Sequence, residues 1–209
     1  MYVGDFMIPK RIIYCWFGEK DKPNAVKNCI ATWKEKMPNW EYLEINETNF
    51  DINSNQYCKD AYDNKMWGFV ADPIRLWALY NYGGIYLDTD IEVYKPFDDL
   101  LNDKLFMGFE QPHYLSTATI GAEKGNPIIK EMLDDYDKEK FEVKQNWWEY
   151  KTSPMIMTDT LSKYFDRDNM EYQKTNEITI YPKKCFTNHE QLDEEVYCKH
   201  NMFGSWIGE

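Results

Sequence analysis

Hydrophobic residues along the chain occur in two alternating patterns, short continuous runs and stripes with helical spacing. Residues 11–17 (RIIYCWF) form a nearly continuous apolar run that Gly18 closes, which is typical of a strand buried on both faces. Residues 23–37 carry apolar side chains at the i, i+3, i+4 and i+7 positions of an amphipathic helix. A second strand is expected over 40–46, so the opening of the chain predicts a β-α-β unit of a parallel sheet.

The stretch over residues 69–93 predicts a helix followed directly by a strand. Asp72 and Pro73 suit an N-cap and a first helical turn, and Gly83 suits the end of that helix. The strand is expected to begin at Ile85 and to continue through Glu92 and Val93, before Pro96 ends it. Its apolar face would carry Ile85, Leu87, Ile91 and Val93, and its other face Tyr86, Asp88, Asp90 and Glu92.

The rest of the chain continues the same mixture of elements without a repeat or a linker. Helices are predicted over 56–66, 127–136 and 155–165, and strands over 105–109, 117–121 and 177–182. At 209 residues the chain is long enough for one sizeable domain and short for two. We therefore expect a single α/β domain over residues 1–209, with a mostly parallel central sheet flanked by helices.

The charge of the chain restricts its partners. With 36 acidic against 24 basic side chains the net charge is −12, which disfavours binding to nucleic acid or to an anionic bilayer. No apolar run reaches the roughly 18 residues of a membrane span, and the first residues lack the apolar stretch of a signal peptide. The 5 cysteines include no C-x-x-C pair, which favours reduced thiols. These features predict a cytoplasmic protein, with peripheral association at a membrane as an alternative.

Asp88 and Asp90 place two carboxylates at the end of an apolar run. On one side of a strand they would lie about 6 to 7 Å apart, where their repulsion favours a bound cation. Mg²⁺ and Mn²⁺ are commonly held by one or two carboxylates together with substrate phosphates. The plainer alternative is a pair of solvated residues. The position favours the metal, because ligands of open α/β sheets bind beyond the carboxyl ends of strands, where the first strand also ends at Trp16.

Residues 70–92 resemble the signature of a known enzyme family. They join Asp72, Arg75, two glycines and the D-x-D of Asp88 and Asp90 at fixed spacing. This arrangement is similar to glycosyltransferase family 32, with its capsular-polysaccharide and yeast mannosyltransferase-like members, and to the catalytic domains of clostridial glucosylating toxins. The opening IPKRIIYCWFG matches the family's first strand, whereas Pro73 departs from its pattern. The resemblance covers the first half of the chain well and the rest thinly.

The resemblance implies a GT-A type nucleotide-diphospho-sugar transferase fold and a metal-dependent, retaining glycosyltransferase. Its cofactor would be Mn²⁺ or Mg²⁺, its donor a UDP-sugar with GDP-mannose as the alternative, and its acceptor a glycan or lipid-linked oligosaccharide. The expected setting is bacterial capsular polysaccharide or lipopolysaccharide synthesis, at the cytoplasmic face of the inner membrane. Residues 1–110 would form the half that binds nucleotide sugar and metal, and residues 111–209 the acceptor side with a closing C-terminal loop.

The resemblance also assigns roles to single residues. Asp90 and Asp88 would bind the metal and, with Arg75, form the catalytic set. The donor would be held by Trp16 stacked on the base, by Asp72, Arg75 and Asp88 on the ribose and sugar, and by Ser205 and Trp206 on the diphosphate. His200 matches the family only loosely, and we expect it to be a packed or surface residue. Glu110 is a weak candidate for a carboxylate near the anomeric carbon, and a surface position is the simpler interpretation.

Two other functions fit parts of the sequence. A metal-dependent phosphohydrolase or nucleotidyltransferase also uses paired carboxylates, but such sites recruit further ligands and the chain has only 3 histidines. A non-catalytic nucleotide-sugar-binding module would hold a structural Ca²⁺ at the D-x-D without turnover. Release of UDP, release of phosphate, or neither would separate the three functions.

Overall fold

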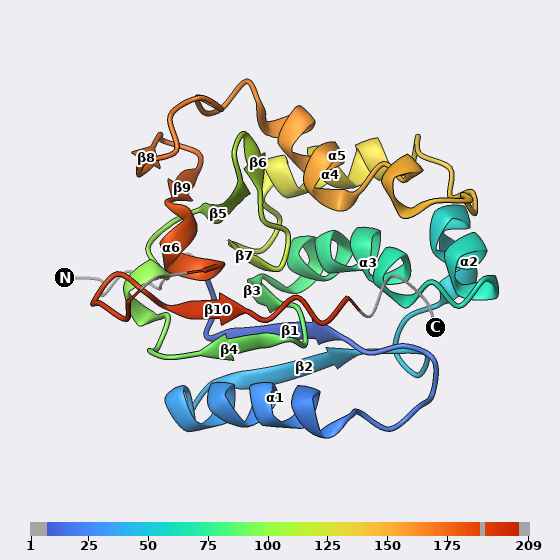
Figure 1. Ribbon diagram of the computed structural model, residues 1–209, viewed down its shortest axis with the longest axis horizontal. Helices are drawn as coiled ribbons and strands as arrows, with labels where there is room; N and C mark the ends of the chain where they lie inside the picture. The colour runs from blue at the N-terminus through green and yellow to red at the C-terminus, as the bar shows by residue number, and fades with distance from the viewer. Residues whose placement is uncertain (1–7, 189–190, 205–209) are drawn as a thin grey trace.

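A computed structural model describes residues 8–188 and 191–204 of the chain, arranged around one mixed β-sheet (Figure 1). The strand order is β2 (Glu41–Ile45), β1 (Arg11–Cys15), β3 (Gly84–Leu87), β7 (Thr119–Ala122), β5 (Leu105–Gln111), β9 (Thr179–Tyr181) and β8 (Gln173–Lys174), with β6 (Tyr114–Leu115) paired to β5. A separate ribbon pairs β4 (Ile91–Val93) with β10 (Cys198–His200) in antiparallel register.

Most strands of the main sheet point the same way. β1 pairs in parallel with both β2 and β3, and β5 pairs in parallel with β9. The strand β7 runs antiparallel to β3 and to β5, so β5 and β9 have the direction of β1 to β3. The predicted mostly parallel sheet is confirmed, and the carboxyl ends of β1 and β3 lie at one edge of it.

Helices cover both faces of the sheet (Figure 1). One face packs against α1 (Asn24–Lys36), together with the β4–β10 ribbon and the short α6 (Lys183–Phe186). The other packs against α2 (Gln56–Asp63), α3 (Trp67–Tyr82), α4 (Pro127–Tyr136) and α5 (Ser153–Leu161). Short 3-10 turns lie at Ile52–Ser54, Asp98–Leu100 and Trp147–Glu149. Among the described residues, none of these helices combines the length and apolar character needed to span a bilayer.

The alternation along β1 explains why its sequence is apolar at successive positions. Ile12 and Tyr14 pack into the core on the side of α1, while Ile13 and Cys15 pack into the core on the side of α3. A strand covered by helices on both faces buries every side chain, so the continuous run predicted this environment correctly.

The start of the helix α3 corrects one prediction. The helix begins at Trp67, with Met66 as its N-cap, and Pro73 lies inside it. Asp72 is therefore not an N-cap. Phe69 and Val70 are buried against the core, and this packing outweighs the hydrogen bond that a proline removes from a helix interior. The carboxylate of Asp72 is consequently available for other contacts.

The expected strand through the acidic pair is also wrong. β3 ends at Leu87, and the next residues form a tight turn in which the Ile91 N–H donates to the Asp88 carbonyl at 3.1 Å. The chain then enters β4, which belongs to the other sheet. Ile91 nevertheless packs into the same core cluster as Leu87, so the predicted apolar face persists across the turn. The turn directs the two aspartates to different neighbours.

Candidate active site

Asp88 leaves the carboxyl end of β3 and is fixed from two sides. Its backbone N–H donates to the Ala118 carbonyl at 2.8 Å, and its Oδ1 accepts a hydrogen bond from the Tyr86 hydroxyl at 2.8 Å. The same Oδ1 lies 3.5 Å from Nη2 of Arg75. Sequence reasoning did not assign a role to Tyr86, although the period of the strand places it on the same side as Asp88.

Arg75 is the buried cation of the site, with a side chain only 4% exposed. Its Nη2 lies 2.9 Å from Oδ1 of Asp72, and its Nη1 donates to the Thr117 carbonyl at 2.7 Å. The guanidinium carbon lies 4.8 Å from the centroid of the Tyr86 ring. The spacing of three residues on α3 brings Asp72 and Arg75 together, as the sequence motif implied.

Burial makes the charges of this cluster interdependent. Burial raises the pKa of Asp72 to about 7, the Arg75 guanidinium opposes this rise, and the Asp88 charge adds to it. Although burial alone would lower the pKa of Arg75, Asp88, Tyr86 and Asp72 together raise it. Arg75 therefore remains a cation that two carboxylates share.

Asp90 is held by the C-terminal segment. Its Oδ1 lies 3.3 Å from Nε2 of His200, and its Oδ2 accepts the Phe203 backbone N–H at 3.0 Å. Its carbonyl accepts the Asn201 N–H at 3.1 Å. Burial raises the pKa of Asp90, but the hydrogen bonds from His200 and Phe203 lower it below its ordinary value.

His200 joins the two aspartates, which sequence reasoning missed. Ligand atoms of Asp88, Asp90 and His200 all lie within 4.8 Å of one another. Burial lowers the pKa of the imidazole, but the Asp90 carboxylate and, less strongly, those of Asp88 and Glu110 raise it above its ordinary value. The pairing of β10 with β4 places His200 there, and no local spacing in the sequence encodes that pairing.

These three side chains fit a divalent cation. Two carboxylates and an imidazole are a donor set that Mn²⁺ and related ions accept, and the remaining positions would be open to water or to phosphate oxygens. Nδ1 of His200 is buried and has no hydrogen-bond partner among residues 8–188 and 191–204. Such an orphaned polar atom indicates that the surroundings of the ring are incomplete without a further group.

Trp16 follows β1 at the same edge of the sheet. Because Ile13 pairs with Tyr86, the ends of β1 and β3 coincide, and the Asp88 charge acts on the pKa of the Cys15 thiol next to Trp16. The indole is half-buried, its Nε1 donates to the Lys20 carbonyl at 2.7 Å, and the Lys22 ammonium lies 5.4 Å from its ring centroid.

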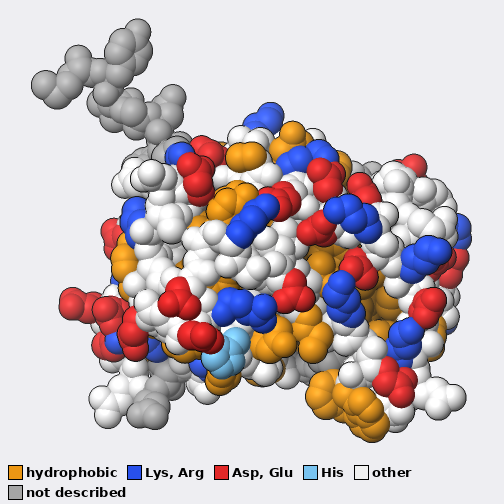
Figure 2. Space-filling view, turned by 90° about the horizontal axis from the view of Figure 1, so that it is seen from above, with side chains coloured by type: hydrophobic (Ala, Val, Ile, Leu, Met, Phe, Trp, Pro, Cys, Tyr) orange, Lys and Arg blue, Asp and Glu red, His pale blue; other side chains and the backbone are white. Residues whose placement is uncertain are grey.

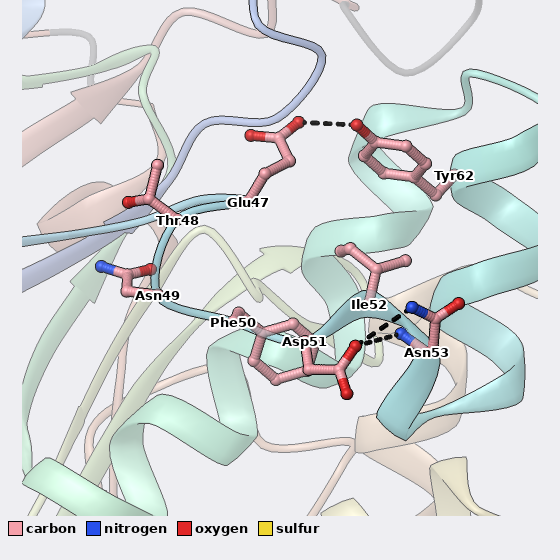
Figure 3. Close-up of a pocket in the computed structure, with 8 residues that line it drawn as sticks. All are labelled: Glu47, Thr48, Asn49, Phe50, Asp51, Ile52, Asn53 and Tyr62. Carbon is pink, nitrogen blue, oxygen red and sulfur yellow. Dashed lines mark hydrogen bonds between the residues drawn. The ribbon is translucent and has the colours of Figure 1, made fainter.

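A hollow in the surface lies beside the loop that follows Trp16 (Figure 3). Residues 47–53 and Tyr62 line it, and neither aspartate of the D-x-D does. Within it, Glu47 accepts the Gly18 N–H at 2.6 Å and the Tyr62 hydroxyl at 3.0 Å. Glu47 thereby links the end of β1 to α2.

Of the remaining predicted site residues, the structure describes Glu110 but not Ser205 or Trp206. Glu110 accepts a hydrogen bond from the Ser116 hydroxyl at 3.1 Å, and it is near enough to His200 for its charge to help raise the pKa of that imidazole. Ser205 and Trp206 lie outside the described residues, and their predicted contacts with a diphosphate stay predictions.

Comparison with known proteins identifies the region that holds most of these residues. Residues 23–107 match the model of the glycosyltransferase sugar-binding region containing a DXD motif. The chain is 26% identical over 144 residues to inositol phosphoceramide mannosyltransferase 3 of Schizosaccharomyces pombe, a match that covers 64% of this chain and 38% of that protein. It is 28% identical over 162 residues to the subversion of eukaryotic traffic protein A of Legionella pneumophila, covering 61% of this chain and 24% of that protein. The chain thus spans less than half the length of these relatives.

A solved structure shares the fold. The PaToxG glycosyltransferase superposes with a TM-score of 0.54 at 20% sequence identity, over 75% of this chain and 69% of that one. The GT-A type architecture predicted from the sequence is confirmed by this likeness and by the sheet described above.

Proposed function

The chain belongs to the glycosyltransferases with a DXD sugar-binding region, and from this premise we propose that it is a metal-dependent retaining enzyme. It would move a sugar from a nucleoside diphosphate to a glycan or lipid-linked oligosaccharide in surface polysaccharide synthesis. The observation that carries the proposal is the convergence of Asp88, Asp90 and His200 within 4.8 Å, beside a buried Arg75. A phosphohydrolase is less favoured, because the three groups are the one metal-ligating cluster found in the described part of the chain.

Asp88, Asp90 and His200 would hold the cation. When bound, it acts as a Lewis acid on the departing diphosphate. The buried Arg75 orients Asp88, because its guanidinium lies beside both this carboxylate and that of Asp72 and neutralises part of their negative charge. Asp90 connects the ligand set to the C-terminal segment through the Phe203 N–H.

The donor contacts follow the family pattern. Trp16 would stack on the base, Asp72 and Arg75 would contact ribose and sugar hydroxyls, and Ser205 and Trp206 would close on the diphosphate. Residues 1–110 would supply most of the donor site, and residues 111–209 the acceptor side. His200 adds one ligand from that second part to the metal site.

The transfer exchanges one bond for another at the anomeric carbon. The bond to the phosphate oxygen breaks, a bond to the acceptor oxygen forms on the same face, and the acceptor proton passes to the released diphosphate. This balance requires no side-chain base. Glu110 stays a candidate for stabilising positive charge on the sugar, since its charge acts on the pKa of His200.

We assign a UDP-sugar as the donor and keep GDP-mannose as the competing donor. The names of fungal relatives, among them two inositol phosphoceramide mannosyltransferases of Schizosaccharomyces pombe, support mannose transfer. A panel of UDP-sugars and GDP-mannose incubated with Mn²⁺ tests both donors through the nucleotide released. Release of UDP or GDP that EDTA and Asp90→Asn abolish supports the proposal, with Asp168→Asn, an aspartate whose side chain is 87% exposed, as the control. Release of inorganic phosphate alone would contradict it.

A further inference from the structure

Two neighbouring tryptophans are exposed at the surface, outside the cluster of Asp88, Asp90 and His200. Trp147 is 58% exposed and Trp148 is 65% exposed, in the 3-10 turn Trp147–Glu149. Their rings lie nearly perpendicular, at 82°, with centroids 6.1 Å apart. Single exposed apolar residues are common, but two adjacent exposed indoles form a patch that indicates a binding surface.

The loop that carries the two indoles is held in place by its own hydrogen bonds. The Lys144 N–H donates to the Tyr150 hydroxyl at 3.0 Å, and the Glu149 carboxylate accepts the backbone N–H groups of Gln145 and Asn146 at 3.2 and 3.3 Å. The Tyr150 ring packs 4.8 Å from that of Phe69 in α3, measured between centroids. The indoles are therefore presented on a preorganised loop, which lowers the entropic cost of binding a ligand.

A cavity of about 330 Å³ opens between this loop and Met66. Trp147 and Trp148 both line it, as do Lys144 and Gln145. Within the described part of the chain, neither indole N–H donates a hydrogen bond, and the side-chain amide of Gln145 makes none, although its backbone N–H does. Aromatic faces beside unused hydrogen-bond donors suit a ligand that has both apolar C–H faces and hydroxyl groups, as a sugar has.

The charges around the cavity favour an uncharged ligand. The Lys144 ammonium lies 2.7 Å from the Glu142 carboxylate, and Lys151 pairs with Glu139, so the loop carries no surplus of positive charge. Figure 2 shows basic and acidic side chains interspersed over one face of the molecule, without a broad basic area. Binding to an anionic bilayer normally uses such an area together with exposed tryptophans.

The cavity lies on the side of the molecule where the first strands end. Met66 precedes Trp67, whose ring closes on the end of β1: a Cβ atom added to Gly18 would lie 2.9 Å from it. In Figure 1 the loop over residues 141–151 lies in the right-hand part of the view, the side toward which β1 and β2 point. A chain of sugars could extend from the acidic site toward this cavity.

We propose that the Trp147–Trp148 cavity is a subsite for the glycan acceptor, binding sugar rings beyond the one that receives the transferred unit. The inference rests on the proposed transferase function. The contacts would be stacking of sugar C–H faces on the indoles and hydrogen bonds from Gln145, Lys144 and the indole N–H groups. Binding energy from such remote units raises the rate only if the acceptor spans both sites, so short acceptors should react more slowly than long ones.

The test compares the wild-type protein with the double variant Trp147→Ala, Trp148→Ala. Binding of mannotriose, maltotriose and cellotriose is measured by isothermal titration calorimetry, and release of UDP from the donor is measured without acceptor. We expect the wild type to bind at least one trisaccharide and the variant to bind it at least about tenfold more weakly, since two stacking contacts are lost. UDP release without acceptor should stay unchanged.

Controls separate an aromatic subsite from a general effect of truncation. The variant Trp147→Tyr, Trp148→Tyr should retain most of the affinity, and Tyr172→Ala, which removes a 50% exposed ring elsewhere, should retain all of it. Equal trisaccharide affinity in wild type and the alanine variant would overturn the subsite. The subsite would also be overturned if the alanine variant lost binding to phosphatidylglycerol vesicles, or lost self-association, and did not lose trisaccharide binding. A wild-type protein that binds trisaccharide at these indoles but releases no nucleotide would contradict the transferase function alone.

Discussion

Asp88 and Asp90 stand two residues apart, yet different parts of the molecule hold them. Asp88 belongs to a buried cluster in which Arg75 and the Tyr86 hydroxyl contact the same carboxylate oxygen. Asp90 instead contacts the C-terminal segment, through His200 and the Phe203 N–H. The turn that ends β3 causes this division, because it directs the first carboxylate to the side of α3 and the second to the β4–β10 ribbon.

We therefore expect folding and the proposed metal binding to depend on different sides of the D-x-D. The Arg75 side is part of the core, and its loss should reduce stability. The His200 side is assembled from segments more than a hundred residues apart, and its loss should reduce metal affinity more than stability. Four measurements test this separation.

The largest expected effect is on stability, from Arg75→Met. Removing the guanidinium leaves Asp72 and Asp88 without their shared cation, and breaking a buried ion pair in this way costs about 3 to 5 kcal/mol of unfolding free energy. Urea denaturation measures it. Lys163→Met, which breaks an exposed pair with Glu131, should cost far less, because solvent screens an exposed ion pair. A loss from Arg75→Met as small as that of the control would show that the Arg75 cluster does not stabilise the core.

The next effect is on activity, from Asp90→Asn. The side chain keeps its size and can still accept the Phe203 N–H, but it loses a negative charge at the proposed metal site. We expect nucleotide release to fall at least about 100-fold, on the scale of losing one electrostatic contact to a developing charge, with little change in stability. A large loss of stability would mean that the Asp90 side also supports the fold, which would remove the proposed difference.

A smaller effect is expected on metal affinity, from His200→Gln. Loss of the imidazole leaves two carboxylates as protein ligands, and the dissociation constant for Mn²⁺ should rise about 10- to 100-fold, the range found for weakened metal sites. Electron paramagnetic resonance of free Mn²⁺ gives the constant directly. His113→Gln changes an exposed histidine and should leave it unaltered. Equal affinity in both variants would remove His200 from the ligand set.

The smallest effect is the pH dependence of stability without metal. Because the pKa of folded His200 is raised above 6.5, its charged form stabilises the fold fully below pH 6.5, and this contribution is lost as the pH rises through the folded pKa. The melting temperature in EDTA should therefore fall between pH 6 and pH 9 more in the wild type than in His200→Gln. Parallel pH profiles would contradict the His200–Asp90 pairing.

Local sequence patterns predicted the helices and strands of this fold well. They predicted the contacts between distant segments poorly. The run over residues 11–17 and the helix over 127–136 were correct because burial on one or two faces fixes their periodicity. Asp72 was misread as an N-cap because the local preference of a proline for a first turn was overridden by packing of the preceding turn. His200 was underestimated because its position depends on the pairing of β10 with β4, which adjacent residues do not encode.

The proposed function depends on a divalent cation at Asp88, Asp90 and His200 that supports cleavage of a nucleotide sugar. The most direct measurement is nucleotide release as a function of Mn²⁺ concentration, in wild type and in Asp90→Asn. We predict saturable stimulation of the wild type from a baseline near zero in EDTA, and no stimulation of Asp90→Asn at the same concentrations. Equal release with and without Mn²⁺, or the same Mn²⁺ response in both proteins, would contradict it.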